Sequence, residues 1–469
     1  MSAESKQRAS ARRVVITGVG AVTALGQTAE SLWKACLAGC SGITPISGFD
    51  VSNYTTRFAG EIKEWDPSPF MDRKEARRMD RFVQFAVAAA SMALEDAGLQ
   101  IDDGNRDRIG VYIGSGIGGL ATIEEQHRVL LERGPGRISP FLIPGIICDM
   151  GAGMVSIVTG ARGPNACITT ACTTGTNNLG DAYEVIRRGA ADAMIAGGAE
   201  ACITPLGMAG FCAARSLSTR NDAPECASRP FDAGRDGFVM SEGSGILILE
   251  ELESALARGA KIYAEIVGYG MSGDAHHITA PSPEGEGAAR AMKAALESAG
   301  LRPEDIDYIN AHGTSTELND KNETAAIKAV LGEHAYRVPV SSTKSMTGHL
   351  IGAAGAVEAI LCALTIRDSV LAPTINYETL DPECDLDYVP NAPRKANVRV
   401  AMSNSFGFGG HNATIILKRL EAGASQVSLL EERVAESPEA AIDFAGLEEE
   451  IELEALVRDL EEDAIAPIR

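Results

Sequence analysis

Short apolar runs alternate with longer segments of helical character along most of the chain. Residues 14–18 form one such run, rich in β-branched side chains, and a second run at 109–113 leads into a glycine-rich stretch. Apolar runs of this length that end at glycines predict buried strands. The predicted strands are 14–18, 109–113, 166–170, 192–197, 245–250, 262–267, 306–310, 338–341, 398–403 and 412–417.

The segments between these strands predict helices. Residues 73–98 are basic at their start and rich in alanine afterwards, and Gly98 is a typical residue to end a helix. Strands that alternate with helices indicate an α/β fold with mostly parallel sheets covered by helices. The alternation starts again near residue 260, which suggests a duplicated fold. The predicted helices are 31–39, 73–98, 122–132, 148–159, 172–188, 287–300, 320–331 and 353–367.

The length and the charge of the chain predict three parts. A chain of 469 residues is too long for one ordinary hydrophobic core. We expect a first half at 12–260, a second half at 261–419 and an acidic extension at 420–469. Residues 421–469 hold 15 acidic and 3 basic residues, a net charge of −12, which predicts a partly disordered, solvated extension. The apolar spacing at 447–460 allows an amphipathic helix within it.

Composition excludes several classes of protein. A net charge of −22 argues against general binding to nucleic acid. No run of about 18 apolar residues is present, so we expect no membrane span, and the polar N-terminus lacks the apolar core of a signal peptide. The ten cysteines include no CxxC pair, which predicts reduced thiols in a cytoplasmic protein and no metal site. Thr23 stands where a dinucleotide fingerprint needs a third glycine, so no nucleotide cofactor is expected.

The segment around Cys172 is the first candidate for chemistry. Cys172 lies among small residues where a predicted strand turns into a predicted helix. The N–H groups at the start of a helix favour a thiolate, so this position predicts a lowered thiol pKa. The small neighbours leave room for a bulky acyl group. The alternative, on this segment alone, is an ordinary buried thiol.

Two histidines and a lysine follow predicted strands in the second half. His312 stands directly after the strand at 306–310, and Lys344 and His349 follow the strand at 338–341. Side chains at strand exits are well placed to face a cleft. The three groups can supply hydrogen-bond donors to a developing oxyanion. Each histidine alone is equally consistent with a polar loop residue.

A glycine-rich segment at 403–410 carries two aromatic residues. Glycines on both sides of Phe408 let the backbone bring an N–H group close to a substrate. Phe406 and Phe408 are also consistent with side chains that fill the core.

Taken in order, four motifs resemble the β-ketoacyl-[acyl-carrier-protein] synthases I and II. The motifs are TACTTG, NAHGTST, SSTKSMTGHLIGAAGAVE and NSFGFGG. The likeness runs from about residue 12 to residue 419 and is closest to the synthase II branch. Thr174 and His411 depart from the residues common at those positions, serine and threonine.

This resemblance implies a fold and a reaction. The fold is thiolase-like: two related α/β halves stacked in five layers, α-β-α-β-α, in a homodimer. The reaction is a decarboxylative condensation of acyl-ACP with malonyl-ACP, where ACP is the acyl carrier protein. It is the elongation step of type II fatty acid biosynthesis. Phosphopantetheine arrives on the carrier protein, so the enzyme itself needs no cofactor.

The resemblance also implies a role for each matching residue. Cys172 is the nucleophile, His312 and His349 bind the malonyl thioester oxygen, and Lys344 orders the site. The resemblance further implies an oxyanion hole and gate at Cys172, Phe408 and Phe406, and pantetheine binding by Thr314 and Thr316. It implies an acyl pocket at Ile117 and Phe211, and a supporting role for Asp320 and Glu323. The implied docking site for the carrier protein consists of Arg73, Lys74, Arg77, Arg78 and Arg215.

Several alternatives remain open. A polyketide ketosynthase carries the same Cys-His-His set, and a chain-length-factor-like partner subunit shares the fold without the nucleophile. A thiolase needs a second cysteine near the last glycine motif, and an initiating synthase needs asparagine in place of His349; the sequence has neither. The acidic extension is either a solvated or partner-binding tail, or a tethered competitor of the carrier for Lys74, Arg77 and Arg78.

Overall fold

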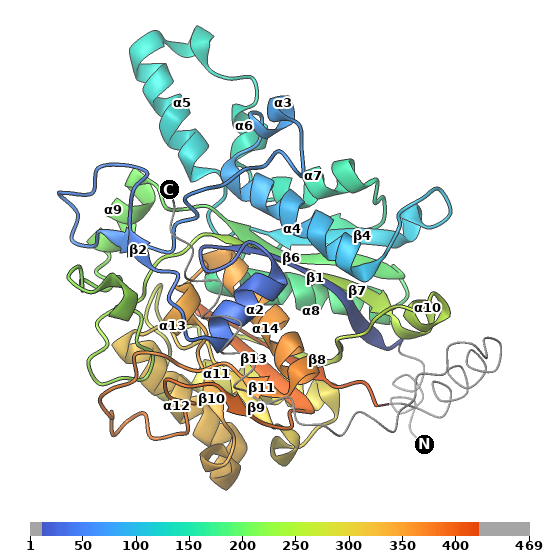
Figure 1. The fold of residues 1–469 in the computed structure, drawn as a ribbon, viewed down its shortest axis with the longest axis vertical. Coiled ribbons are helices and arrows are strands. Elements are labelled where there is room, and N and C mark those ends of the chain that lie inside the picture. The colour runs from blue at the N-terminus through green and yellow to red at the C-terminus, as the bar shows by residue number, and fades with distance from the viewer. Residues whose placement is uncertain (1–11, 422–469) are drawn as a thin grey trace, which may run out of the picture. The chain divides into compact units, whose positions relative to one another are not determined.

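In the computed structural model, which describes residues 12–421, ten strands form one continuous hydrogen-bonded sheet (Figure 1). The five strands of the first half are, in spatial order, β5 (Asn165–Ala166), β4 (Ile109–Gly114), β6 (Ala193–Glu200), β7 (Gly243–Glu251) and β1 (Val14–Thr23). The five of the second half continue from β1 as β8 (Ala264–Gly273), β14 (His411–Lys418), β13 (Val400–Gly407), β9 (Tyr308–Asn310) and β10 (Val340–Ser341).

The two sets of strands repeat one topology. In the first half β1 and β7 are antiparallel, β7 and β6 are antiparallel, and β6, β4 and β5 are parallel. In the second half β8, β14, β13, β9 and β10 follow the same sequence of directions. A short antiparallel contact between β1 and β8 joins the sets. The expected duplication is therefore present, but the prediction of mostly parallel pairing was wrong, because each half contains two antiparallel pairings of long strands beside two parallel pairings.

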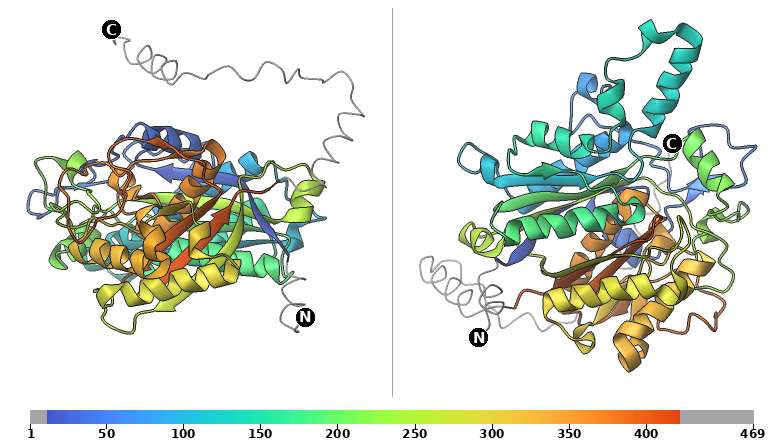
Figure 2. Two further views of the ribbon diagram at one scale, coloured as in Figure 1. Left: turned by 90° about the horizontal axis from the view of Figure 1, so that it is seen from below. Right: turned by 180° about the vertical axis from the view of Figure 1, so that it is seen from behind.

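Helices lie on both faces of the two halves and between them (Figures 1 and 2). Helices α4 (Arg81–Ala97) and α7 (Met150–Thr159) cover the outer face of the first half, and α11 (Glu286–Ala299) and α12 (Glu317–Leu331) cover that of the second. Helices α8 (Thr174–Arg187) and α14 (Ala354–Asp368) pack against each other and against strands of both halves. This is the five-layer α-β-α-β-α arrangement of the thiolase-like fold.

Hydrophobic burial accounts for the layers. Every residue of α14 from 354 to 366 is buried, because this helix has sheet or helix on all sides. One apolar cluster fills the middle layer around α8 and α14, and two further clusters lie under α4 and under α11 and α12. Helices between two sheets need apolar side chains all round, whereas α11 keeps one exposed polar face.

The predicted helix at 73–98 is wrong, because the chain breaks it into two. A short helix α3 (Arg73–Ala76) ends before Asp80, and α4 begins at Arg81. The Asp80 carboxylate accepts a hydrogen bond from the backbone N–H of Phe82 and two more from Thr122. An aspartate held in this way starts a new helix rather than continuing an old one.

The remaining elements are short or peripheral. They are α2 (Ala29–Leu37), α5 (Leu120–Arg133), α6 (Leu142–Ile146), α9 (Pro205–Ala213), α10 (Leu252–Ala257), α13 (Lys344–Thr347), β2 (Thr44–Pro45), β3 (Phe58–Ala59), β11 (Val370–Leu371) and β12 (Arg394–Lys395). In residues 12–421 no helix is long and apolar enough to cross a membrane. The helix predicted at 447–460 lies outside the described residues.

Candidate active site

Cys172 lies in a tight turn at the start of α8. A single 3-10 turn, Ala171–Thr173, precedes the helix. Ala171 has a φ of +54°, a conformation that costs energy for any residue but glycine and that often marks functional turns. The backbone N–H of Thr170 donates to Thr174 Oγ1 at 2.9 Å and closes the turn. The thiol is thus presented at the N-terminal end of a helix, as the sequence predicted.

His312 and His349 approach the same point from the second half. His312 follows β9, and the Glu323 carboxylate accepts hydrogen bonds from the backbone N–H groups of His312 and Gly313, both at 2.8 Å. His349 follows α13, and its Nδ1 accepts a hydrogen bond from the backbone N–H of Ile351 at 3.3 Å. Because Nδ1 is the acceptor, the ring proton of neutral His349 is on Nε2.

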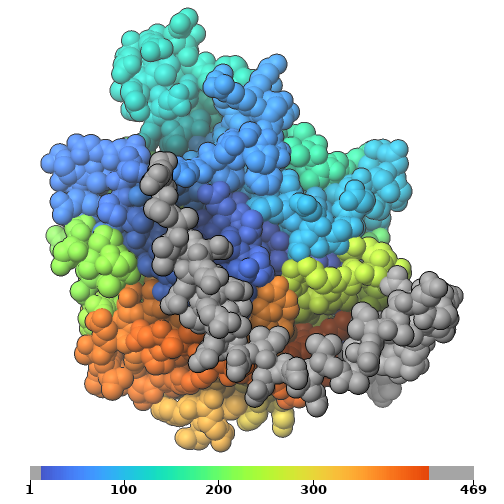
Figure 3. Space-filling view, viewed as in Figure 1, coloured from blue at the N-terminus to red at the C-terminus, as the bar shows by residue number. Residues whose placement is uncertain are grey.

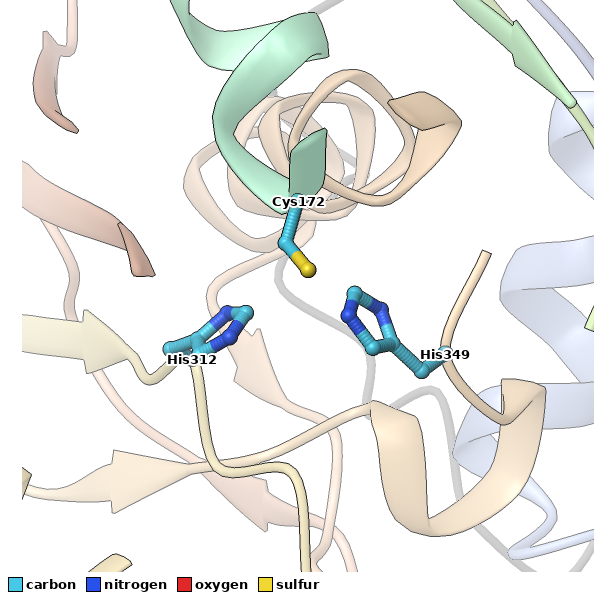
Figure 4. Close-up of side chains that lie close together, drawn as sticks. All are labelled: Cys172, His312 and His349. Carbon is cyan, nitrogen blue, oxygen red and sulfur yellow. The ribbon is translucent and has the colours of Figure 1, made fainter. Parts of the chain in front are cut away.

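The three side chains converge in a buried space (Figure 4). The Cys172 Sγ and one nitrogen of each histidine all lie within 4.8 Å of one another. The two imidazole rings are 5.4 Å apart between centroids and nearly perpendicular, at 86°. Among the described residues, His312 Nδ1 and His349 Nε2 are buried without a hydrogen-bond partner. A buried polar atom without a hydrogen-bond partner indicates that a ligand binds there or that its position has another cause.

Burial, rather than the helix, controls the pKa of the Cys172 thiol. Burial raises this pKa to about 11, although the N–H of Phe408 and the charge of Lys344 act in the opposite direction. The prediction of a lowered thiol pKa was therefore wrong. Burial and, after it, the charge of Lys344 lower the pKa of both histidines well below the usual value. Near neutral pH the site holds a neutral thiol and two neutral imidazoles.

Lys344 is buried beside a carboxylate that the sequence reasoning did not single out. Its ammonium group forms an ion pair with Glu358 of α14. Burial raises the pKa of Glu358 to about 7, with Lys344 acting against this rise. A signal was present in the sequence, because Glu358 is the only charged residue in the apolar stretch 354–366.

The glycine-rich segment reaches the nucleophile from β13. A Cβ atom on Gly407 would lie 3.1 Å from the backbone nitrogen of Cys172, a tight contact that glycine avoids. Gly409 and Gly410 have φ of +84° and +72°, which turn the chain back into β14. The backbone N–H groups of Phe408 and Cys172 both lie within hydrogen-bonding reach of the thiol. Phe406 is buried, with its ring 5.7 Å from that of His312.

The residues predicted to bind substrate surround the histidines. The hydroxyls of Thr314 and Thr316 are hydrogen-bonded at 2.9 Å in the loop after His312. Ile117 and Phe211 belong to one apolar cluster. Within that cluster the ring of Phe238 lies 5.5 Å from Phe211 and 5.4 Å from His349. The predicted acyl pocket is therefore continuous with one side of His349.

The two predicted supporting acids have different positions. Glu323 holds the backbone of the His312 loop, as described above. Asp320 accepts a hydrogen bond from the N–H of Phe231 at 2.8 Å and lies 3.8 Å from Arg235. Asp320 thus supports the neighbouring loop, and its partners there are Phe231, Asn319 and Arg235 rather than the groups of the reacting centre.

The predicted basic patch is exposed but is not one helix face. Helical spacing alone would place Arg81 on one face with Lys74 and Arg78, but Arg81 turns inward to Glu242 and stacks on Phe85. Arg78 lies over the Phe141 ring, 4.9 Å from its centroid, where α5 and α6 project beside α3 (Figures 1 and 3). The exposed residues of the patch are Arg73, Lys74, Arg77 and Arg78 on and after α3, and Arg215 after α9.

Cys172, His312 and His349 are also the one group of possible metal ligands that comes together in the part of the chain described here. A metal requires an unprotonated ring nitrogen and a thiolate. The hydrogen bond from Ile351 leaves the free nitrogen of His349 protonated. The geometry therefore suits hydrogen-bond donation better than metal binding.

Comparisons with known proteins agree with this geometry. Residues 11–255 match the model of the β-ketoacyl synthase N-terminal domain, and residues 263–378 match that of the C-terminal domain. The chain is 58% identical to the 3-oxoacyl-[acyl-carrier-protein] synthase 2 of Synechocystis over 87% of this chain and 99% of the relative. It is 57% identical to that of Staphylococcus aureus strain N315, over 88% and 99%.

Solved structures show the same likeness. A β-ketoacyl synthase from Burkholderia phymatum has a TM-score of 0.82 and 39% identity, over 87% of this chain and all of that one. A ketosynthase solved with its type II polyketide acyl-carrier protein and bound to a hexaketide has a TM-score of 0.81 and 37% identity, over 88% and all of that chain. This chain therefore belongs to the β-ketoacyl synthase family.

Proposed function

We propose that the chain is an acyltransferase, a 3-oxoacyl-[acyl-carrier-protein] synthase of the synthase 2 type. It condenses acyl-ACP with malonyl-ACP and releases 3-oxoacyl-ACP and CO₂. The observation that carries this proposal is the buried convergence of the Cys172 thiol with two neutral imidazoles. In this proposal the reaction needs no cofactor of its own, because the reacting thioesters arrive on the pantetheine arm of the carrier protein, and Thr314 and Thr316 bind that arm.

The first half-reaction transfers the acyl group to Cys172. The sulfur attacks the thioester carbon of acyl-ACP, and the bond from that carbon to the carrier sulfur breaks. The backbone N–H groups of Cys172 and Phe408, both of which favour the ionised thiol, stabilise the oxyanion. The thiol proton leaves through His312, whose ring Nδ1 has no hydrogen-bond partner among the described residues, and passes to the departing carrier thiolate.

The second half-reaction begins with malonyl-ACP. The bond to the carboxylate carbon breaks, CO₂ leaves, and the electron pair enters an enolate. Its oxygen accepts hydrogen bonds from His349 Nε2–H and from His312, the two ring groups that are buried without other partners. Fixed hydrogen-bond donors in a site that excludes water lower the energy barrier to decarboxylation, because they stabilise the negative charge that forms on the enolate oxygen. The enolate carbon then attacks the acyl-Cys172 thioester, and the carbon–sulfur bond breaks to release the product and the Cys172 thiolate, which takes up a proton from solvent to restore the thiol.

Similarity favours primary fatty acid elongation over polyketide synthesis. The chain is 57–58% identical to the synthase 2 relatives and 37% identical to the polyketide ketosynthase. A partner subunit without activity is disfavoured, because Cys172 lies in contact range of both histidines.

The partner, the assembly and the location are part of the same proposal. The acidic carrier protein docks on the exposed basic patch defined above. A second copy of the chain buries large apolar side chains that the described residues leave exposed, among them Leu131, Ile143 and Ile157. Ten free cysteines fit a reducing cytoplasm. Light scattering would measure the mass of the assembly, and a monomer at working concentration would contradict the homodimer.

The experiment that tests the reaction is mass spectrometry of the protein after incubation with a panel of acyl-ACPs. We expect one acyl group on Cys172, and the panel will show which chain lengths load. Cys172→Ala should lose both the acyl adduct and condensation, and Cys172→Gln should keep malonyl-ACP decarboxylation, because its amide resembles an acylated cysteine. Condensation at the parental rate by Cys172→Ala would refute the proposal.

A further inference from the structure

Glu200 is a fully buried carboxylate that the proposed reaction does not use. It is the last residue of β6, and it accepts hydrogen bonds from Ser115 Oγ and Gly116 N–H at 2.9 Å and from Gly352 N–H at 3.1 Å. The first two donors belong to the loop after β4, in the first half. The third belongs to the 3-10 turn Ile351–Ala353, in the second half. One carboxylate thus joins two loops that border the active site.

The backbone around Glu200 is built to bring these loops close together. A Cβ atom on Gly116 or on Gly352 would lie 2.9 Å from Glu200 Oε2, and one on Gly352 would collide with the Gly116 nitrogen. Both glycines are therefore required for the approach. The thiols of Cys148, Cys172 and Cys202 are the titratable groups that feel its charge. Burial raises the pKa of Glu200 to about 7, against the hydrogen bonds from Ser115 and the backbone N–H groups. A carboxylate buried at such cost indicates a function more often than simple packing.

Each loop leads to a different part of the chemistry. Gly116 precedes Ile117, which lies in the apolar cluster of the predicted acyl pocket. Gly352 follows Ile351, whose φ of +49° is unfavourable and whose N–H donates to His349 Nδ1. The same N–H keeps the His349 proton on Nε2, facing the thiol. A displacement of the Gly352 turn would therefore relieve the backbone strain at Ile351 and remove the hydrogen bond that fixes the tautomer of His349.

We propose that Glu200 is a positioning residue that couples the acyl-pocket loop at Gly116 and Ile117 to the orientation of His349. The inference rests on the proposed function, because it concerns acyl loading and malonyl decarboxylation. It predicts that one substitution changes two properties together: the preference for acyl chain length, set by the pocket loop, and the decarboxylation rate, set by His349.

The test compares Glu200→Gln with Glu242→Gln. Glu242, the residue before β7, is a matched control, since it is also buried but its carboxylate pairs with Arg81 and the N–H of Ile62 rather than with the Gly116 and Gly352 loops. For Glu200→Gln we expect the decarboxylation rate to fall at least ~10-fold, since small misplacements of catalytic groups cost up to ~100-fold. The ratio of kcat/KM between long and short acyl-ACPs should shift as well. Glu242→Gln should change thermal stability and leave that ratio at the parental value.

The outcomes separate the coupling from a merely structural role. If Glu200→Gln lowers all rates by one factor together with stability, as a structural residue would, the coupling is refuted. A parental decarboxylation rate and chain-length ratio would also refute it. Should Glu200→Gln fail to fold, Ser115→Ala decides: it removes one donor to Glu200, and shifts of both properties support the coupling, while no shift overturns it. Failure of the proposed function itself would appear separately, as absence of an acyl-Cys172 adduct in the parent enzyme.

Discussion

Replacing Lys344 by methionine should destabilise the protein in a way that depends on pH. Lys344 and Glu358 are both buried, and the second carboxylate oxygen of Glu358 has no hydrogen-bond partner among the described residues. Removing one member of a buried ion pair leaves an uncompensated charge, which is strongly unfavourable. The Glu358 carboxyl avoids that penalty by binding a proton. The cost of Lys344→Met is then the cost of protonating Glu358 at the working pH.

The magnitude follows from the pKa of Glu358, which burial raises to about 7. At pH 8.5, protonating this carboxyl costs about 2 kcal/mol, at about 1.4 kcal/mol per pH unit above the pKa. At pH 6 the carboxyl of the parent is already largely protonated, so the loss is close to zero. The sign is therefore fixed: the contribution of Lys344 is present where Glu358 is ionised, above pH ~7, and disappears as the pH falls through that value.

The assay is the difference in thermal midpoint between variant and parent at pH 6 and at pH 8.5. For a protein of this size, about 2 kcal/mol corresponds to roughly 2–3 °C. Lys321→Met is the matched control, because Lys321 pairs with Glu383 on the surface and its loss should leave the midpoint nearly unchanged at both pH values. Adding Glu358→Gln to Lys344→Met should abolish the pH dependence of the difference. An equal loss at both pH values, or a loss as large in Lys321→Met, would refute the reasoning.

Four further predictions concern the reaction and its substrates. His349→Ala should lower malonyl-ACP decarboxylation by ~10²–10³ while self-acylation from acyl-ACP falls less, measured as CO₂ release and as protein adduct; the reverse pattern would contradict its role. Charge reversal at Lys74 and Arg78 should raise KM for ACP substrates and not for small thioester mimics; equal effects would argue against docking. A chain ending at Leu420 should show a lower KM for acyl-ACP at low salt only, if the acidic extension competes with the carrier. Alkylation of Cys172 by iodoacetamide should accelerate about tenfold per pH unit between pH 7 and 9, and a plateau near pH 7 would refute a pKa of about 11.

The sequence predicts the layout of the site well, because local patterns determine it. Cys172, His312 and the segment with Lys344 and His349 each follow a predicted strand, and in the structure these strand exits meet at one place. The glycines around Phe408 likewise predict a close backbone approach, which Gly407 makes to Cys172. Strand exits can be read from apolar runs and glycines alone.

Features that depend on distant partners were not predictable in this way. Helical spacing places Arg81 beside Lys74 and Arg78. In the structure, however, Asp80 is hydrogen-bonded to Thr122 and begins a new helix, and Arg81 forms an ion pair with the buried Glu242. Lys344 and Glu358 are in different helices, and the donors to Glu200 come from both halves of the chain. A buried acid in an apolar stretch signals that a partner exists, but it does not say which residue that partner is.

The pKa of Cys172 shows how the two kinds of information combine in the chemistry. A helix start favours the thiolate, and this local effect is visible in the sequence; burial opposes it, and burial is a property of the whole fold. Because burial dominates, the resting thiol is neutral, and so are the two imidazoles beside it. A neutral imidazole can donate its ring N–H to an enolate oxygen and can also accept the thiol proton, and a neutral thiol resists adventitious alkylation. The nucleophile therefore has to give up its proton to His312 as it attacks the bound thioester, whose developing oxyanion is stabilised by the backbone N–H groups of Cys172 and Phe408.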